Sequence, residues 1–298
     1  MKRNYIVILV LSMIFTSCKD NELFEHEMYK NMVALISSDY HNTFEEIVPL
    51  TGEEVIGYIA ASSGGTHAPN NDIVIGLEED QTPLDLYNWS LFDADENLYA
   101  KLLPKDKYEI VEYKIQIKAG ERTGRTMVKL HPDGLSPDST YFIGLKATDI
   151  SGVEINEKKN TILYQVLIEN NYASQATNSI YAMTGLADEM VSAGNKKLFP
   201  LTQNSVRVIA GTETFESKVK DIEETAIILE INDDNTVSIK PYKDIKVTQL
   251  DGDPNYPNTF TVEESFGRTF NVFLLSYEYT LDGVTRIMKE RLEMQVNQ

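Results

Sequence analysis

The residue types that commonly carry catalysis do not occur in arrangements that could use them. The four histidines, His26, His41, His67 and His131, are scattered, with no spacing that places two on one helix face or one strand, so we expect no zinc site. The sequence contains no GxSxG motif, no phosphate-binding Gly-Lys-Ser/Thr motif and no dinucleotide glycine pattern. Glycoside hydrolysis needs two carboxylates, but 46 acidic residues supply such pairs by chance. We therefore predict a protein that is not an enzyme and holds no metal or cofactor.

The only cysteine, Cys18, directly follows a short apolar run. Lys2 and Arg3 make a basic start, and residues 5–15 carry no charge. A helix of that length covers roughly half of the ~20 residues needed to cross a bilayer. A basic start before a short apolar stretch is instead typical of a secretory signal peptide, which we assign to residues 1–17.

Residues 15–18, Phe-Thr-Ser-Cys, resemble the bacterial lipobox. That resemblance implies that the thiol of Cys18 takes a diacylglyceryl group and that Cys18 becomes the mature N-terminus; the alternative is an ordinary core cysteine. Several acyl chains give stable anchoring, at about 0.8 kcal/mol per buried methylene. Residues 19–22, Lys-Asp-Asn-Glu, resemble the acidic signal that exports Bacteroidetes lipoproteins to the outer face of the outer membrane. We therefore expect a lipid-anchored protein facing the cell exterior, with residues 18–27 as a tether.

Composition excludes one class of partner. The net charge is −19, and removal of residues 1–17, with Lys2 and Arg3, leaves 25 basic against 46 acidic residues, or −21. Such a chain repels phosphate backbones, so we expect no nucleic-acid partner. Its length and 42% hydrophobic content indicate two domains with cores of their own.

The first half reads as β-structure with one helix. Short runs rich in β-branched and aromatic residues, such as EVIGYIAAS and DIVIGLE, are separated by turn-forming residues. Residues 113–118 alternate between apolar and polar, and the turn at residues 118–124 predicts a hairpin with the strand that follows. Thr82 as cap and Pro83 in the first turn predict a short helix. We expect an Ig-like antiparallel β-sandwich over residues 28–170.

The second half again reads as strands. A polar break at residues 170–172 marks the boundary, and residues 232–235, Asn-Asp-Asp-Asn, join two strands as a turn. The segment TFNVFLLSYEY is largely apolar on both alternating faces, which suits a closed barrel or a covered sheet. We expect residues 171–298 to form a β-barrel or sandwich domain.

Several segments resemble a family of two-domain surface lipoproteins encoded in Bacteroidetes glycan-utilisation loci. In the first half these are DIVIGLEED, LDLYN, LLPKDKYEI, IQIKAGERTG and GLSPDSTYFIGLKAT; in the second they are YAMTG, FPLTQNSVRVIAG and VSIKPY. The resemblance implies an N-terminal β-sandwich domain of unknown function, a C-terminal partner domain, and capture of a glycan for an outer-membrane transporter. Some relatives fuse the first domain to a glycoside hydrolase, but no hydrolase-sized region remains here.

Sugars bind to proteins by stacking on aromatic rings, framed by amide and carboxylate hydrogen bonds. Tyr256 lies in a loop between prolines, with Asn255 and Asp251 nearby, and Trp89 lies on the helix face away from Leu84. We predict these four residues, Tyr256, Trp89, Asn255 and Asp251, as candidate glycan contacts. The same loop could supply oxygen ligands for calcium, but it lacks the spacing of a calcium loop and reads as a turn.

Two other functions remain open. A structural surface protein, such as an adhesin or pilus component, would also be lipid-anchored and rich in β-sandwiches, but it would need a spare strand or an unpaired edge. A weak glycosidase would release reducing sugar from glycans.

Overall fold

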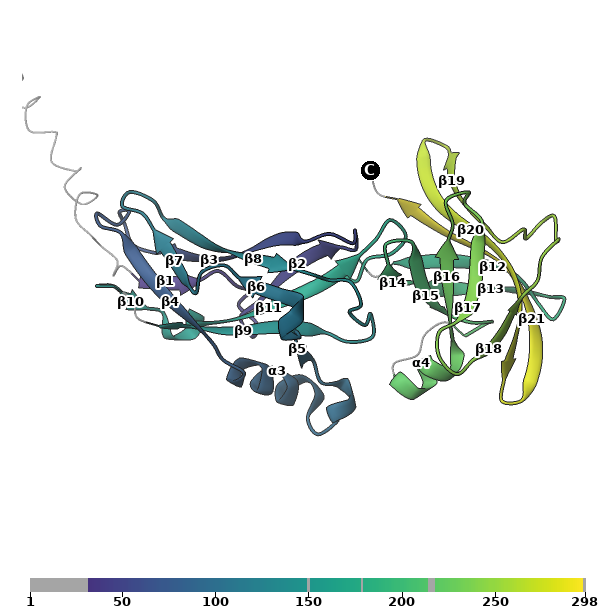
Figure 1. Ribbon diagram of the computed structural model, residues 1–298, viewed down its shortest axis with the longest axis horizontal. Helices are drawn as coiled ribbons and strands as arrows, with labels where there is room; N and C mark the ends of the chain where they lie inside the picture. Colours follow the sequence, from purple (N-terminus) through teal and green to yellow (C-terminus); the bar gives the residue numbers. More distant parts are fainter. Residues whose placement is uncertain (1–31, 149–150, 178, 214–217, 297–298) are drawn as a thin grey trace, which may run out of the picture.

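The computed structural model describes residues 32–148, 151–177, 179–213 and 218–296. The predicted signal peptide, Cys18 and the tether lie outside the described residues. The chain forms two β-rich bodies, one after the other along the long axis of the molecule (Figure 1). The prediction of an all-β, two-domain chain is confirmed.

The N-terminal body is a sandwich of two sheets. Their strand orders are β10-β1-β3-β8-β6 and β2-β11-β9-β4-β7, with β5 pairing with β9. Most pairs are antiparallel, but three are parallel: β2 with β11, β10 with β1, and β5 with β9. The strands are β1 (Met32–Leu35), β2 (Thr43–Pro49), β3 (Val55–Ser63), β4 (Ile73–Glu79), β5 (Lys101–Leu102), β6 (Tyr108–Ile110), β7 (Lys114–Ile117), β8 (Thr123–Leu130), β9 (Tyr141–Thr148), β10 (Glu154–Ile155) and β11 (Thr161–Glu169).

The predicted helix is α3 (Thr82–Phe92), which covers the outer face of one sheet. Leu84 packs with Ala100, Phe142 of β9 and Leu163 of β11. The prediction that Thr82 caps the helix is wrong, because the cap position is Gln81 and Thr82 is the first helical residue; the backbone N–H of Thr82 donates to the Asp80 carboxylate at 2.9 Å. Short 3-10 helices η2 (Glu96–Leu98), η3 (Lys105–Lys107) and η4 (Glu157–Lys159) lie in connecting segments.

The hairpin predicted at residues 118–124 is wrong. β7 pairs with β4 in one sheet, whereas β8 pairs with β3 and β6 in the other, so the turn connects the two sheets. Ile115 and Ile117 of β7 and Val128 of β8 are all fully buried in the shared core. Alternation shows that one face of a strand is buried, but it does not show which sheet the strand joins.

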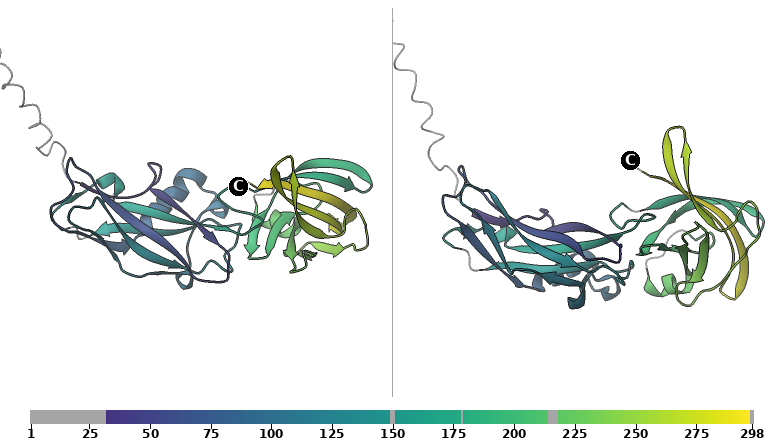
Figure 2. Two further views of the ribbon diagram at one scale, coloured as in Figure 1. Left: turned by 90° about the horizontal axis from the view of Figure 1, so that it is seen from above. Right: turned by 45° about the horizontal axis from the view of Figure 1, so that its top comes forward.

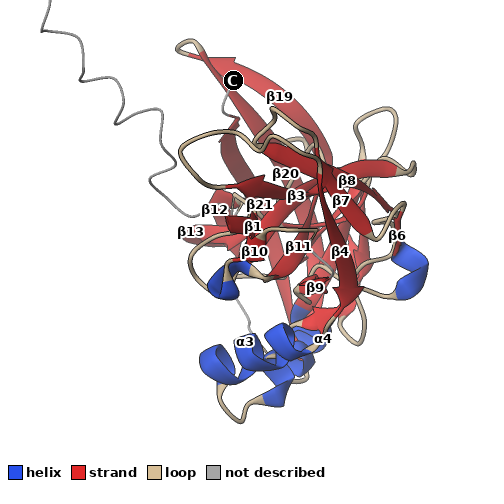
Figure 3. Ribbon diagram, turned by 90° about the vertical axis from the view of Figure 1, so that its left-hand side faces the viewer, coloured by secondary structure: helices blue, strands red, loops and turns tan. Residues whose placement is uncertain are grey.

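The C-terminal body consists of two curved sheets around a second core, as the right-hand view of Figure 2 shows. Their orders are β13-β12-β21-β20-β18, with β19 on β20, and β14-β15-β16-β17. The elements are β12 (Ile180–Ala187), β13 (Met190–Lys197), β14 (Phe199–Thr202), β15 (Ser205–Ile209), α4 (Val219–Thr225), β16 (Ala226–Ile231), β17 (Val237–Pro241), β18 (Lys246–Gln249), β19 (Thr259–Ser265), β20 (Arg268–Leu281) and β21 (Val284–Val296). The helix α4 was not predicted; it lies on the same side of the molecule as α3 (Figures 1 and 3).

Two sequence predictions for this half are confirmed. Residues 232–235 form the turn between β16 and β17, with Asn235 at φ 65°. The segment TFNVFLLSYEY forms β20, in which Phe273, Leu275 and Tyr277 face the core, while Val272 on the other face is also fully buried.

A buried ion pair ties the second core together. Lys196 and Glu290 are both fully buried, with Nζ 2.8 Å from Oε2. Lys196 also donates to the carbonyl of Ile209 at 3.0 Å, and the Tyr277 hydroxyl donates to Glu290 at 2.8 Å. Burial, followed by the negative charge of Glu290, raises the pKa of Tyr277. Since each charged group has hydrogen-bond partners, the pair is a structural element that joins β13, β20 and β21.

Candidate functional site

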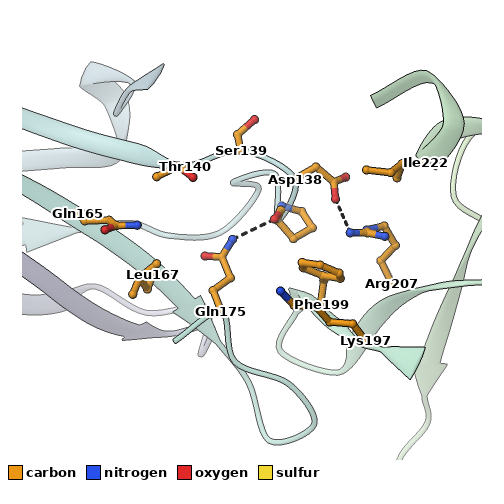
Figure 4. Close-up of a pocket in the computed structure, with 11 residues that line it drawn as sticks. Asp138, Ser139, Thr140, Gln165, Leu167, Gln175, Lys197, Phe199, Arg207 and Ile222 are labelled. Carbon is orange, nitrogen blue, oxygen red and sulfur yellow. Dashed lines mark hydrogen bonds and ion pairs between the residues drawn. The ribbon is translucent and has the colours of Figure 1, made fainter. Parts of the chain in front are cut away.

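A cleft of about 340 Å³ lies where the two bodies meet (Figure 4). One wall comes from the loop between β8 and β9, from β11 and from the segment after it; the other comes from β13, β14, β15 and α4. The lining residues are Pro137, Asp138, Ser139, Thr140, Gln165, Leu167, Gln175, Lys197, Phe199, Arg207 and Ile222. Sites at domain junctions with a mixed apolar and polar lining are typical binding sites, commonly of about 300–1,000 Å³.

A tight turn fixes Asp138 at the edge of the N-terminal body. The backbone N–H of Ser139 donates to the carbonyl of Ser136 at 3.3 Å, and Pro137 occupies the position in which proline favours such a turn. Leu135, before the turn, is buried in the core of the N-terminal body and anchors the loop there. The Asp138 side chain is only 9% exposed and points across the junction toward Arg207 (Figure 4).

Arg207 lies on β15, in the C-terminal body. It lies opposite Phe199 in the β14–β15 pair, which places both side chains on one face, and its guanidinium carbon is 4.1 Å from the Phe199 ring centroid. Arg207 Nη2 lies 2.5 Å from Asp138 Oδ1, and the Tyr242 hydroxyl donates to Asp138 Oδ2 at 2.8 Å. The carboxylate of one body is therefore held by an arginine and a tyrosine of the other.

Burial shifts the titration of these groups. Burial lowers the pKa of the Arg207 guanidinium, and the Asp138 carboxylate opposes that shift. Burial and the nearby Asp138 charge raise the pKa of Tyr242 to about 12. Burial, together with the Arg207 charge, lowers the pKa of Lys197, whose ammonium lies 4.8 Å from the Phe199 ring centroid. All of these directions follow from placing charged groups in a poorly hydrated junction.

The segment that joins the two bodies is pinned on both sides of the cleft. The amide of Gln175 donates to the carbonyl of Pro137 at 3.0 Å and accepts from the N–H of Ile168 at 2.8 Å. The amide of Asn170 donates to the carbonyls of Thr202 and Ser205 at 2.7 and 2.9 Å. These hydrogen bonds attach the connecting segment to both bodies, and so fix the two walls of the cleft relative to each other.

Other polar groups in the cleft are available to a ligand. Within the described part of the chain, the side-chain amide of Gln165 and the hydroxyl of Thr140 form no hydrogen bond. The Ser139 hydroxyl accepts from Lys101 at 3.0 Å and retains its own proton to donate. A second hollow of about 450 Å³ shares Asp138 and Ser139 and extends toward Lys101, Tyr242 and Lys243.

The structure places Trp89 on the outer face of α3. Its side chain is 60% exposed, as expected for a residue on the face opposite the buried Leu84. Leu86, one turn earlier on that face, is 64% exposed. Trp89 therefore faces solvent on the N-terminal body and does not line the cleft.

The other three predicted contacts lie together in the loop between β18 and β19. Tyr256 is half-buried, and Asn255 and Asp251 are exposed. Asp251 accepts from the amides of Gln249 and Asn258 at 2.7 and 3.2 Å. Asp253 accepts from the backbone N–H groups of Asn255 and Tyr256 at 2.9 and 3.3 Å, as in a turn. The loop does not contribute to the cleft lining, and Trp89 lies in the other body.

Among the described residues, no three or more His, Cys, Asp or Glu side chains are grouped so that they could hold a metal ion. None of the helices in this part of the chain is long and apolar enough to cross a bilayer.

Sequence reasoning missed the residues that build the cleft, although a signal was present. Asp138 falls within GLSPDSTYFIGLKAT, Phe199 and Arg207 fall within FPLTQNSVRVIAG, and Tyr242 ends VSIKPY. These are three of the segments that carry the family resemblance, and they come together in space at the junction.

Family models account for nearly all of the described chain. A model of an N-terminal domain matches residues 26–154, and a model of the corresponding C-terminal domain matches residues 160–294. The chain belongs to this two-domain family. A search of curated proteins gives no significant match.

Several solved structures of Bacteroides proteins have the same fold as this chain. A Bacteroides ovatus protein of unknown function is 17% identical, with a TM-score of 0.70 over 89% of this chain and 94% of its own. A second Bacteroides ovatus protein of unknown function is 15% identical, with a TM-score of 0.68 over 93% and 94%. A protein described as an auxiliary nutrient binding protein from Bacteroides thetaiotaomicron is 12% identical, with a TM-score of 0.60 over 87% and 94%. At these identities the likeness establishes the two-domain fold.

Proposed function

We propose that this protein is a non-enzymatic lipoprotein of the outer cell surface that binds a glycan in the cleft between its two domains and passes it to an outer-membrane transporter. The observation that supports this most is the cleft itself, which combines an aromatic ring, amides and hydroxyls at a rigid junction. The description of the Bacteroides thetaiotaomicron relative as a nutrient binding protein agrees with such a role.

The chemistry of the lining suits a sugar. The side chains of Leu167 and Ile222 and the edge of the Phe199 ring, whose face is occupied by Arg207, offer apolar surface to the C–H faces of a sugar ring. Gln165, Thr140 and Ser139 offer donors and acceptors for hydroxyl groups. Because the walls are already fixed by hydrogen bonds, little ordering entropy is lost on binding.

The same lining argues for binding without cleavage. Among the described residues that line the cleft, Asp138 is the sole carboxylate, and it is engaged by Arg207 and Tyr242. Hydrolysis of a glycosidic bond by the usual routes requires two carboxyl groups, one of which must act as a proton donor. Incubation with bound glycans should therefore release no reducing sugar.

The test is a glycan array on the intact mature protein, followed by calorimetric titration of variants with a glycan that binds. Gln165→Ala should weaken binding about tenfold, the effect of losing one or two hydrogen bonds in a buried site. Gln81→Ala, at an exposed position before α3, is the matched control and should bind as the wild type does. Trp89→Ala and Tyr256→Ala test the contacts predicted from the sequence.

Each outcome is informative. Loss of affinity in Trp89→Ala or Tyr256→Ala, with Gln165→Ala unchanged, would move the binding site to α3 or to the loop between β18 and β19. No binding to any glycan would overturn the proposed function and leave a structural surface protein as the better account.

A further inference from the structure

The outer edge of β13, in the C-terminal body, is long and unprotected. β13 is the last strand of its sheet, and within the described part of the chain it pairs with β12 alone (Figure 2). Its first six residues, 190–195, read Met-Val-Ser-Ala-Gly-Asn and include no charged residue and no proline. The side chains of Met190 and Val191 are 71% and 89% exposed. Unpaired backbone groups along such an edge are a template for another strand.

The other edge strands of the described sheets contain charged residues or prolines, which usually prevent such pairing. These residues are Glu45, Glu46 and Pro49 in β2, Lys101 in β5, Glu109 in β6, Lys114 in β7, Glu154 in β10, Pro200 in β14, Lys240 and Pro241 in β17, Lys246 in β18, and Glu263 and Glu264 in β19. In β13, charged residues occupy only the last two positions, and the first of these, Lys196, is buried against Glu290. Six consecutive residues of β13 are therefore open to pairing.

The turn before β13 determines which of its backbone groups face outward. Residues 188 and 189 form a two-residue turn, with φ of 49° and 64°, and Ala187 lies opposite Met190. In such a hairpin the two residues that flank the turn hydrogen-bond to each other, and every second residue along the strand bonds to the neighbouring strand in the same way. The N–H and C=O groups that point away from β12 are therefore those of Val191, Ala193 and Asn195.

The chemistry of this edge suits a second copy of the same edge. The chain carries a net charge of −19, so most of its surface repels another copy, and a neutral edge is where two copies approach at the lowest cost. Antiparallel pairing about a two-fold axis places Ala193 opposite Ala193 of the second copy, and Val191 opposite Asn195. It also keeps the acidic turns, residues 188–189, of the two copies at opposite ends of the paired strands.

We propose that this protein forms a two-fold dimer in which the β13 strands of two copies pair antiparallel and join their sheets. Both copies use the same edge, so association ends at two copies and does not extend into a fibre. The proposal is independent of the proposed function, because residues 190–195 do not line the cleft.

Sedimentation equilibrium of the mature chain, residues 18–298 with Cys18→Ala, measures association without a lipid anchor. We expect the mass to double as the protein concentration rises, without any glycan. Ala193→Pro removes an N–H that points outward, so it should keep the hydrogen bonds to β12 and leave the protein monomeric. Ala193→Lys places two like charges opposite each other and should also prevent the dimer. Val262→Lys, at a 60% exposed position of β19, is the matched control and should dimerise as the wild type does.

A single cysteine tests the register of the pairing. Hydrogen-bonded antiparallel partners have Cα atoms about 5.5 Å apart, within the range of a disulfide. In the Cys18→Ala chain, which has no other cysteine, Ala193→Cys should therefore give a disulfide-linked dimer on mild oxidation. Thr184→Cys is the matched control, because Thr184 lies opposite Ala193 on β12. Its two copies would be three strand spacings, about 14 Å, apart and should not cross-link.

A mass that stays monomeric at every concentration would overturn the proposal. A dimer that persists in both Ala193→Pro and Ala193→Lys would place the interface elsewhere and overturn it too, as would equal cross-linking of Thr184→Cys and Ala193→Cys. None of these results bears on glycan binding, which the array tests separately.

Discussion

At the residue scale, the ion pair between Asp138 and Arg207 joins the two domains. Both side chains are nearly inaccessible to solvent, and Tyr242 satisfies the second oxygen of Asp138. The sequence offered 46 acidic and 27 basic residues, and nothing in their spacing singles out this pair. Its members lie on two domains, and only the folded chain brings them together.

Asp138→Asn should destabilise the protein by about 3 kcal/mol, because it leaves the buried guanidinium of Arg207 without a counter-charge. The free energy of unfolding in urea measures this change. Asp133→Asn, in an exposed position of the same loop, is the matched control and should stay within about 0.5 kcal/mol of the wild type. Equal stabilities of the two variants would mean that the junction is hydrated and that the ion pair contributes little.

A second prediction at this scale concerns Cys18, which lies outside the described residues. Cys18→Ala should abolish labelling with a radioactive fatty acid and move the protein from the membrane fraction to the soluble fraction, because the acyl chains supply the anchor. Replacement of Asp20 and Glu22 by alanine should leave the label in place and reduce cleavage by protease on whole cells. Labelling that persists in Cys18→Ala would refute the lipid anchor.

At the element scale, α3 shows how a single buried polar side chain positions an exposed surface. Asn88 is 5% exposed; its amide donates to the carbonyl of Ala100 at 2.9 Å and accepts from the N–H of Ala100 at 2.8 Å. This pairing ties α3 to the segment just before β5, while Leu84 packs against Phe142 of β9 and Leu163 of β11. The sequence was sufficient to predict the helix and the face that bears Trp89, because helical spacing separates Leu84 from Trp89.

Asn88→Ala should cost about 3 kcal/mol, since it leaves a buried backbone donor and acceptor of Ala100 unpaired. Thermal or urea unfolding of the variant checks this, with Asn97→Ala at an exposed position as control. A change below about 0.5 kcal/mol would show that water replaces the lost hydrogen bonds.

The sequence predicted the strands and turns better than it predicted which strands pair with one another. The strands and the turn at residues 232–235 follow from local alternation and turn chemistry, both of which the sequence displays directly. The turn at residues 118–124 was misassigned because Ile115 and Val128 each need only a buried face, and two opposing sheets satisfy that need as well as one. Sheet membership depends on contacts between distant segments, which alternation does not encode.

At the scale of the whole molecule, the two hydrophobic cores are separate. Buried side chains between Val33 and Ile168 form one, and those between Ala173 and Leu292 form the other. We predict that fragments 18–170 and 171–298 each unfold cooperatively in calorimetry, because each contains a complete core. Two insoluble fragments would show that neither half folds without its neighbour.

The cleft belongs to this scale because neither domain contains it alone. Gln165 comes from the N-terminal body, and Phe199 and Arg207 come from the C-terminal body. The residues predicted from the sequence, Trp89 and Tyr256, were chosen for local exposure, which a single loop or helix can reveal. The family-like segments contain the residues of the cleft, but only the folded chain shows that these segments meet, and for that reason sequence reasoning did not find the site.

The central claim is that a glycan binds between the domains, and hydrogen–deuterium exchange of the intact protein tests it most directly. Exchange is measured with and without a saturating glycan identified on the array. We expect slower exchange in peptides that cover residues 136–140 and 197–207, because a bound ligand would contact both walls of the cleft and reduce their local opening. Protection confined to residues 82–92 or 251–258, with the cleft peptides unchanged, would contradict the account.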